Sequence, residues 1–316
     1  KNMLNPGFQH MLLEINRFNR LADKLVNAPA DQTLADFLSA QRFKGRLIND
    51  YLIPMAAAIW SAKPELILGF PAAYFGHFFA NHGLLSINNR PQWKTVMGGS
   101  QRYVAALSKP FADRIKTSSP VKIVQRMNEQ VRVTLDNTAT ESYDCIVFAC
   151  HSNDALAMLD QPTAEEKEIL GNIGFHNNET ILHTDRNLMP RNTRAWAAWN
   201  YHRFDDEEKQ VSVTYNMNIL QHLSTKEPLL VSLNATKHIN PDKILQTFNY
   251  EHPVYTQQSV AARQRLGEIN GENMTFYCGA YWGYGFHEDG AKSAADIVVA
   301  INGRTNDEQL HLQRIN

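Results

Sequence analysis

The sequence has few cysteines, no long apolar run and no excess of charge of either sign. Its 316 residues include three cysteines, Cys145, Cys150 and Cys278. An odd number without a paired framework indicates free thiols in a reducing, cytoplasmic compartment and excludes a disulfide scaffold. Because Cys145 and Cys150 flank an apolar run, we expect buried structural thiols there rather than reactive ones.

The charge balance excludes one class of partner. The chain carries 31 basic and 32 acidic residues, a net charge of −1 and a pI near 6.9. A nucleic-acid-binding protein would show clustered Lys and Arg and a high pI, so we expect no nucleic-acid partner. The sequence has no CxxC motif, and its 12 histidines do not follow metal-ligand spacings. We therefore expect no metal site.

No stretch reaches 18 uninterrupted apolar residues, so the sequence predicts no transmembrane helix. Two segments come closest, residues 51–60, which Pro54 interrupts, and residues 69–85, which Pro71 interrupts. Both segments fit buried helices. They also fit an apolar substrate pocket or an entrance in peripheral contact with a membrane, because exposed apolar surface usually marks a binding site.

The spacing of apolar residues divides the sequence into a helical part and a part rich in strands. The first ninety residues are mainly helical, beginning with apolar residues at three- and four-residue steps: Leu4, Phe8, Met11, Leu12, Ile15 and Phe18. Strands are predicted at 121–127, 130–136 and 144–149, and the third is continuously apolar, as a parallel strand buried on both faces is. Further strands within 177–235 indicate a second, mostly antiparallel sheet.

The C-terminal part predicts a strand over 274–281, a Gly-rich loop and a helix that ends at Gly303. A helix N-terminus exposes unpaired N–H groups and partial positive charge, so it can stabilise an anionic ligand. Gly279 lets another group approach the end of the strand. Taken alone, this arrangement fits either a ligand site or a tight turn.

The segment CGAYWGYGFHEDGAKSA resembles the C-terminal flavin-contacting motif of the NAD/FAD-binding, flavin-containing amine-oxidoreductase family. More narrowly, the chain resembles a bacterial branch often encoded beside cyclopropane-fatty-acid synthases. The further matching segments are NMLNPGFQHMLLEINRFNR, MGGSQRYVAAL, DCIVFACHSNDALAML, LHTDRNLMPRNTRAWAAWNYHR and HPVYTQQSVAARQRL.

The resemblance implies a truncated two-domain amine-oxidase-like FAD fold of the α/β class. In that fold a Rossmann-like FAD domain is interleaved with an α+β substrate domain. Residues 1–97 would form the helical part of the substrate domain, 98–175 an FAD-domain segment, 176–270 the substrate-domain sheet, 271–304 the C-terminal FAD-domain strand and helix, and 305–316 a tail.

The resemblance also implies which residues bind FAD and substrate. The expected FAD-binding residues are Val121, whose backbone would meet the adenine, and Ala149, Cys150, Gly279, Ala280, Gly285, Phe286, His287, Glu288, Asp289 and Gly290. Tyr281, Trp282 and Tyr284 would form an aromatic wall on the substrate side, or would simply pack a core loop. The family's catalytic lysine has no match, so the catalytic residues stay unassigned.

Two groups of polar side chains permit two interpretations each. His287, Glu288 and Asp289 could form a general-base cluster or cap the following helix, since acidic residues are favoured in the first turn. His183 and His202, on predicted strands, could line a substrate cavity or be structural histidines with satisfied hydrogen bonds.

The sequence departs from the family in one respect. The dinucleotide fingerprint GxGxxG is missing, and the run from Gly283 to Gly285 lacks the third glycine. We interpret this as loss of a unit that belongs before Lys1, or as a cofactor half supplied in another way. An unpaired sheet edge left by that loss would favour oligomers.

The resemblance predicts an FAD-dependent oxidoreductase that transfers a hydride to flavin from a small or lipid-like substrate, either an amine or an acyl chain. The alternative is a catalytically incomplete relative that binds a ligand or a partner protein.

Overall fold

The computed structural model describes residues 4–62, 64–86, 91–128, 130–204 and 212–315. The chain divides into two compact units, each made of two separate stretches. Unit 1 comprises Lys1–Arg114 and His176–Gln257, and unit 2 comprises Ile115–Phe175 and Gln258–Asn316. Residues 98–114 lie in unit 1, whereas the sequence analysis grouped them with the strands that follow. The assignment of these units to cofactor and substrate stays a prediction.

Unit 1 begins with a group of helices around an aromatic core: α1 (Pro6–Asn19), α2 (Ala22–Val26), α3 (Leu34–Ala40), the π-helix η2 (Ile48–Leu52), α4 (Ile53–Trp60), α5 (Pro64–Leu68) and α6 (Ala72–Asn81). Helix α7 (Gln101–Ser108) and the 3-10 helix η3 (Lys109–Arg114) follow and contain no buried residue. Trp60 packs against Phe70, Phe78 and Tyr255, with ring centroids 4.5–6.1 Å apart. The apolar segments around 51–60 and 69–85 are therefore buried helices in this unit.

Helix α1 buries only part of its apolar stripe. Met11 and Phe18 are buried, whereas Leu12 is 42% exposed. Leu4 precedes the helix and is 87% exposed. The three- and four-residue spacing correctly predicts a helix, but the surface that covers α1 is narrower than the apolar stripe.

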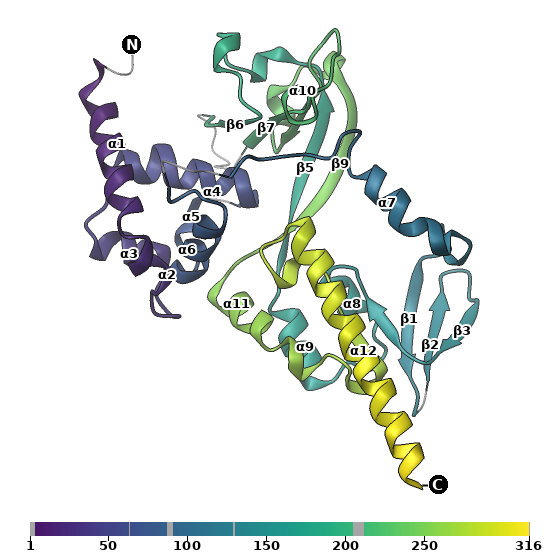
Figure 1. Ribbon diagram of the computed structural model, residues 1–316. Coiled ribbons are helices and arrows are strands. Elements are labelled where there is room, and N and C mark those ends of the chain that lie inside the picture. Colours follow the sequence, from purple (N-terminus) through teal and green to yellow (C-terminus); the bar gives the residue numbers. More distant parts are fainter. Residues whose placement is uncertain (1–3, 63, 87–90, 129, 205–211, 316) are drawn as a thin grey trace. The chain divides into compact units, whose positions relative to one another are not determined.

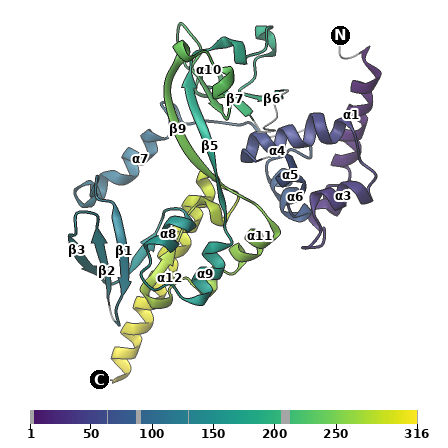
Figure 2. The same ribbon diagram turned by 180° about the vertical axis from the view of Figure 1, so that it is seen from behind.

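The second part of unit 1 is a five-stranded sheet of order β6-β7-β8-β5-β9, and Figures 1 and 2 show the long strands β5 and β9 side by side. Its elements are β5 (Phe175–His183), β6 (Trp199–His202), β7 (Ser212–Asn216), α10 (Met217–Gln221), β8 (Leu230–Leu233) and β9 (Ile244–Pro253). The pairs β5–β8, β6–β7 and β7–β8 are antiparallel, which confirms the predicted character of this sheet.

Unit 2 contains two smaller sheets and four helices. Its elements are β1 (Val121–Arg126), β2 (Val131–Leu135), β3 (Thr140–Tyr143), β4 (Ile146–Phe148), α8 (Ser152–Met158), α9 (Ala164–Gly171), α11 (Gln257–Gln264), β10 (Thr275–Tyr277) and α12 (His287–Ile315). Strands β1, β2 and β3 form an antiparallel meander. Strand β3 went unpredicted because its sequence, TESY, has no apolar alternation.

Strands β4 and β10 form a separate parallel pair, as the continuous apolar run at 144–149 predicts, but β4 is not buried on both faces, since Val147 is 39% exposed. On one face, Phe148 and Tyr277 belong to a core cluster with Val124, Ile169 and Leu170. On the other, Phe276 and Cys278 pack against Ile297 of α12. The pair is thus sandwiched between helices, as strands of parallel sheets usually are.

Helix α12 differs from its prediction at both ends. It begins at His287, four residues earlier than the helix predicted from Ala291, and it continues past Gly303 to Ile315. The early start has a local cause, because Asp289 caps the chain at Phe286. The predicted stop at Gly303 is wrong. Its backbone does not adopt the left-handed conformation that ends a helix at a glycine.

Candidate functional site

The carboxyl ends of β4 and β10 lie beside each other in unit 2. The register pairs Tyr277 with Phe148, and the Cys278 N–H donates to the Phe148 carbonyl at 2.9 Å. The ladder therefore brings Ala149 and Cys150 next to Gly279. In open α/β sheets, ligands bind at this carboxyl edge of parallel strands.

Gly279 makes the sharp turn that leaves β10. Its φ is +154°, and a Cβ at this position would lie 2.6 Å from the Tyr281 ring. No side chain fits here, so the glycine is required by close approach as well as by conformation. The Gly279 N–H donates to Ser293 Oγ at 3.1 Å, which ties the turn to helix α12. Ala280–Trp282 then forms the 3-10 helix η10.

The loop from Gly283 to Phe286 is closed by Asp289. Asp289 Oδ2 accepts a hydrogen bond from the Phe286 N–H at 3.0 Å. A Cβ on Gly283 would lie 2.3 Å from Asp289 Oδ1, so the carboxylate occupies the space that a side chain would need. Of the two interpretations of residues 287–289, the structure supports helix capping for Asp289.

The first turn of α12 has a glycine, Gly290, on the side that faces Ala280. A Cβ on Gly290 would meet Ala280 at an ordinary contact distance of 3.7 Å, without a clash. The helix N-terminus thus stands beside the end of β10 without a bulky side chain at position 290. A partly positive helix end of this kind is suited to an electron-rich ring edge or an anion.

Tyr281 and Trp282 each place a polar atom in the interior of unit 2. Tyr281 is 4% exposed and belongs to the core cluster, and Trp282 packs against that cluster. The Tyr281 hydroxyl and the Trp282 indole N–H are buried, and neither makes a hydrogen bond of normal geometry in the described chain. The Trp282 side chain is nevertheless close enough to the Tyr281 hydroxyl to counteract part of the rise in its pKa. The two polar groups thus lie beside each other in the interior of unit 2.

Burial raises the pKa of both tyrosines of this loop. For Tyr281, burial is the main cause, and nearby Cys150 adds to it. For Tyr284, burial again acts first, followed by the charge of Asp289. Both phenols therefore stay protonated at neutral pH and can donate a hydrogen bond. Whether they form a wall beside the substrate stays a prediction, although Tyr281 itself packs into the core.

The cysteines are free thiols, consistent with the structural role expected of them. Burial raises the pKa of Cys150, with Asp154 as the second cause, and burial alone raises that of Cys278. Burial, followed by the charge of Asp144, also raises the pKa of Cys145. The three thiols therefore stay protonated and poorly nucleophilic.

A cavity of about 190 Å³ lies beside the loop. It is lined by Arg263, Leu266, Asn270, Trp282, Gly283, Asp289, Lys292, Ser293 and Asp296. Arg263 is 7% exposed, and its guanidinium donates to the Tyr281 carbonyl and to Ser259 Oγ. This buried cation fixes the backbone of η10 from the side of α11.

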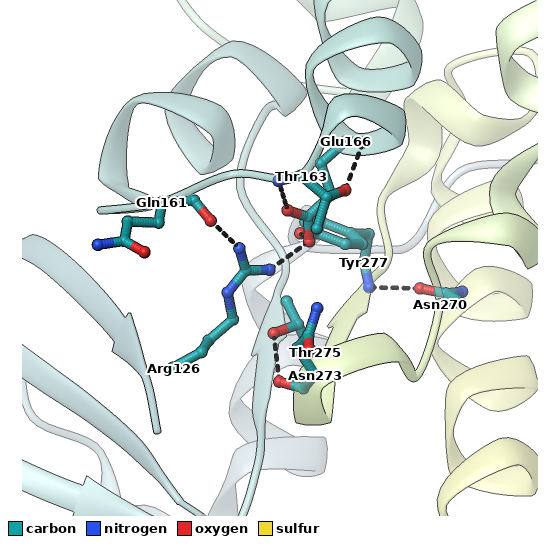
Figure 3. Close-up of polar contacts among 8 residues, drawn as sticks. All are labelled: Arg126, Gln161, Thr163, Glu166, Asn270, Asn273, Thr275 and Tyr277. Atoms are coloured by element: carbon teal, nitrogen blue, oxygen red, sulfur yellow. Dashed lines mark hydrogen bonds and ion pairs between the residues drawn. The ribbon is translucent and has the colours of Figure 1, made fainter. Parts of the chain in front are cut away.

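A buried ion pair holds strand β10 in place (Figure 3). Glu166, at the start of α9, accepts hydrogen bonds from Arg126 of β1 and from the Tyr277 hydroxyl, the latter at 2.7 Å. Arg126 also donates to the Gln161 carbonyl, and Glu166 forms a capping box with Thr163. Because Tyr277 lies two residues before Gly279, this network positions the strand that presents the loop.

Sequence reasoning missed this network. The pattern Thr163-x-x-Glu166 is a capping-box signal that predicts the start of α9. It does not predict that the same carboxylate pairs with Arg126, forty residues earlier in the sequence. Among the residues expected to bind FAD, the structure brings Ala149 and Cys150 to the Gly279–Gly290 loop. Val121 instead lies in the separate β1–β3 sheet, and its expected contact with adenine is not tested.

His183 and His202 are part of a hydrogen-bonded row across the sheet of unit 1. His183 Nε2 contacts Ser232 Oγ at 2.8 Å, Ser232 Oγ contacts Thr214 Oγ1 at 2.6 Å, and Thr214 Oγ1 contacts His202 Nε2 at 2.8 Å. The Asp185 N–H donates to His183 Nδ1. The two histidines are therefore satisfied structural residues, one of the two interpretations offered above.

One direction in that row is fixed. Because His183 Nδ1 accepts a hydrogen bond from the Asp185 N–H, the neutral His183 donates from Nε2 to Ser232 Oγ. In the contacts of Thr214 with Ser232 and with His202, either atom can be the donor. Burial, followed by the neighbouring His238 and His183, lowers the pKa of His202 to about 4.

The described residues contain no group of three or more His, Cys, Asp or Glu side chains that could hold a metal ion. In the same part of the chain, no helix is long and apolar enough to cross a membrane.

A parallel strand pair, a Gly-rich loop and a helix N-terminus at its carboxyl edge define a nucleotide-cofactor type of α/β fold. The family model for flavin containing amine oxidoreductase matches residues 9–229. The chain belongs to this family. It is a flavin-dependent oxidoreductase, its cofactor is FAD, and it has the amine-oxidase FAD fold.

Solved structures share the fold at low sequence identity. A CLA-producing fatty acid isomerase from P. acnes is 12% identical, with a TM-score of 0.67, over 95% of this chain and 76% of its own. Cyclohexylamine oxidase from Brevibacterium oxydans IH-35A is 11% identical, with a TM-score of 0.61 and the same shares. A variant of putrescine oxidase is 12% identical, with a TM-score of 0.61, over 92% and 75%. Among curated proteins, no sequence matches this chain.

Proposed function

We propose that this protein oxidises a small or lipid-like substrate, an amine or an acyl chain, by hydride transfer to FAD held at the Gly279–Gly290 loop. The observation that carries the proposal is the meeting of three features in unit 2: the carboxyl ends of β4 and β10, the N-terminus of α12, and the buried polar atoms of Tyr281 and Trp282. When bound, flavin supplies the two-electron chemistry.

The residues present fit a flat, electron-rich ring. Gly279 and Gly290 place no side chain at their own positions in the turn. Gly285, Phe286 and His287 lead into the helix N-terminus. In our proposal these backbone groups face the ring. Ala280, Glu288 and Asp289 complete the contact, Asp289 by fixing the loop. The Trp282 N–H and the Tyr281 hydroxyl supply donors to the cofactor or to an ordered water.

We also propose that the chain belongs to the bacterial branch associated with cyclopropane-fatty-acid synthases, on the strength of the run CGAYWGYGFHEDGAKSA. Proteins of similar fold act on two different classes of substrate. The P. acnes protein is a fatty acid isomerase, and two others are oxidases of cyclohexylamine and putrescine. Contact with a membrane surface, self-association and a cytoplasmic location stay predictions.

An absorption spectrum tests the proposal. We expect a flavin band near 450 nm that stays with the purified chain, after incubation with FAD, on a desalting column. Gly290→Ala should not lose thermal stability, because the added methyl meets only ordinary contacts, yet it should retain less FAD because the ring loses its approach. Gly303→Ala, where a methyl meets nothing within 4 Å, is the matched control and should retain FAD normally.

Substrate assays separate the two classes. Bleaching of bound flavin by an unsaturated fatty acid, with none by cyclohexylamine or putrescine, would support the acyl class, and the reverse would support the amine class. One specific observation favours the alternative function, a ligand- or partner-binding protein without activity: the sequence has no GxGxxG run. A chain that never retains FAD would support that alternative.

A further inference from the structure

The connection between β5 and β6 in unit 1, residues 184–198, carries a positive patch and is called the arginine loop below. Its three arginines, Arg186, Arg191 and Arg194, are all exposed. Within the described residues, none of their side chains forms an ion pair or a hydrogen bond. The loop therefore presents guanidinium groups that no carboxylate of the described chain neutralises by direct contact.

The acidic residue of the arginine loop faces inward. Asp185 is 5% exposed, and both of its carboxylate oxygens accept hydrogen bonds from backbone N–H groups. Oδ1 accepts from Asn187 at 3.0 Å, and Oδ2 accepts from Asn240 at 2.8 Å. The outer surface of the loop consequently carries positive charge with no acidic side chain of its own.

The backbone of the arginine loop is held in one shape. It contains two 3-10 helices, η4 (Arg186–Leu188) and η5 (Thr193–Ala195). Leu188 is buried in a core cluster of unit 1, and the Trp196 indole N–H donates to the Pro190 carbonyl at 2.8 Å. A backbone fixed in this way reduces the entropy lost when the three arginines bind a partner together.

Exposed apolar side chains lie at the same end of the sheet. His183, at the end of β5, and Asn216, just before α10, both pair with Leu230, so the arginine loop and α10 follow from neighbouring strand ends (Figure 1). On α10, Ile219 is 42% exposed, and Leu223 after it is 36% exposed. Basic and apolar side chains on one surface are typical of proteins that bind at a membrane interface.

The other charges at this end of the sheet cancel in pairs. The Lys243 carbonyl accepts from the Thr184 N–H, which places residues 242 and 243 beside the arginine loop. Lys243 forms an ion pair with Glu227 at 3.5 Å. Asp242 and Lys226 are both exposed and opposite in charge. The arginines are thus left as the net positive charge of this surface.

We propose that the arginine loop and α10 form a docking surface for an anionic phospholipid membrane. The arginines bind headgroup phosphates, which guanidinium groups suit, and Ile219 and Leu223 enter the interfacial layer. The choice of a membrane rests on the acyl class of substrate in the proposed function, since such a substrate dissolves in lipid. Nucleic acid, another polyanion, is a poorer fit to a chain of net charge −1.

Cosedimentation of the full chain with sucrose-loaded lipid vesicles tests the proposal. Vesicles of phosphatidylcholine and phosphatidylglycerol in equal parts supply an anionic surface, and vesicles of phosphatidylcholine alone supply a neutral one. We expect the chain to pellet with the anionic vesicles only. High ionic strength should release it, because salt screens the attraction between arginine and phosphate.

The double variant Arg191→Glu with Arg194→Glu should bind anionic vesicles about tenfold or more weakly, because each basic residue near the surface contributes to binding and each glutamate is repelled. The matched control is Lys122→Glu with Arg132→Glu, which makes the same change of charge at exposed positions of β1 and β2 and should bind as the wild type does. Ile219→Ser should weaken binding without changing its salt dependence, and it tests the surface even if the arginine variant fails to fold.

Three results would overturn the proposal: no pelleting with anionic vesicles, equal pelleting with neutral ones, and an equal loss of binding in the two double variants. Bleaching of bound flavin separates this proposal from the proposed function. Vesicle binding without bleaching by an unsaturated fatty acid contradicts only the acyl oxidation. Bleaching without vesicle binding contradicts only the docking surface.

Discussion

Arg126 and Glu166 form a buried ion pair between strand β1 and helix α9, with side chains 9% and 1% exposed. The same carboxylate accepts a hydrogen bond from the Tyr277 hydroxyl. Burial alone would raise the pKa of Glu166, but the hydrogen bonds from Arg126, Tyr277 and Thr163 outweigh it, and the pKa is lowered. The pair therefore stays charged while it anchors the strand that leads to the Gly279 loop.

Glu166→Gln should destabilise unit 2 by about 3–5 kcal/mol, because Arg126 would be left buried without a counter-charge. Chemical denaturation at neutral pH measures the change. The exposed pair Lys116–Glu141 is the control, and Glu141→Gln should alter stability very little. A small effect of Glu166→Gln would mean that solvent reaches Arg126.

The pH dependence of stability follows from the same carboxylate. The folded-state pKa of Glu166 lies below its ordinary value of 4.5, so its contribution is present above that value. The contribution is lost as the pH falls through the lowered folded-state pKa. Melting temperatures measured between neutral and strongly acidic pH should therefore fall more steeply for the wild type than for Glu166→Gln. Parallel curves would contradict this assignment.

Gly283→Ala should weaken the start of α12. The added methyl would come within 2.3 Å of Asp289 Oδ1, so the carboxylate must move and its bond to the Phe286 N–H is lost. Loss of a helix cap costs about 1 kcal/mol, and unfolding by denaturant would report it. Gly303→Ala should instead gain about 0.5–1 kcal/mol from helix propensity, since its methyl meets nothing within 4 Å. Equal effects would exclude the Asp289 mechanism.

His202→Gln should flatten the acid limb of the stability curve of unit 1. The pKa of His202 is about 4 in the folded chain against an ordinary 6.5, so the unfolded chain binds the extra proton between these values. The contribution of neutral His202 to stability is therefore fully present above pH 6.5. It is lost as the pH falls toward 4, which lowers the free energy of unfolding by about 2 kcal/mol after solvent screening.

A glutamine oxygen can still accept from Thr214 Oγ1 but does not titrate, so thermal melts between pH 4 and 6.5 should change less in this variant. His77→Gln, on the exposed side of α6, removes a histidine outside the row and should keep the wild-type slope. An unaltered slope in His202→Gln would show that another group titrates there.

Gly76→Ala should destabilise unit 1 although alanine is the better helix former. A Cβ on Gly76 would lie 2.9 Å from Leu25 Cγ and 3.0 Å from the backbone of α2 at Leu25 and Val26. Because the backbone of α2 cannot shift without disturbing its packing, we expect the free energy of unfolding to fall by about 1–3 kcal/mol. Gly303→Ala, the same change inside a helix where the methyl meets no atom within 4 Å, is the control. Thermal unfolding of both variants decides whether α2 and α6 approach this closely.

Much of the secondary structure is determined locally, and the sequence predicts it well. The period of two in residues 130–136 and the unbroken apolar run at 144–149 predict β2 and β4, because side-chain direction in a strand depends only on its own backbone. The Gly-rich turn at Gly279–Gly290 is likewise recognisable, since close approach and turn geometry demand particular residue types at fixed spacing.

Where the pattern failed, the cause lay outside the segment. The run TESY carries no apolar signal, and it is a strand only because β2 offers it a partner. Leu12 fits an apolar stripe, yet it is 42% exposed in the folded chain. The start of α12 is different, because its cause is local: Asp289 caps the chain at Phe286.

The sequence by itself determined the family, the cofactor class and most elements, because these depend on local residue patterns. Only the tertiary structure decided that Glu166 pairs with Arg126 and Tyr277, and that His183 and His202 share one row of hydrogen bonds. These relationships join residues far apart in the chain, and hydrogen bonds between them require folded geometry that no local pattern encodes.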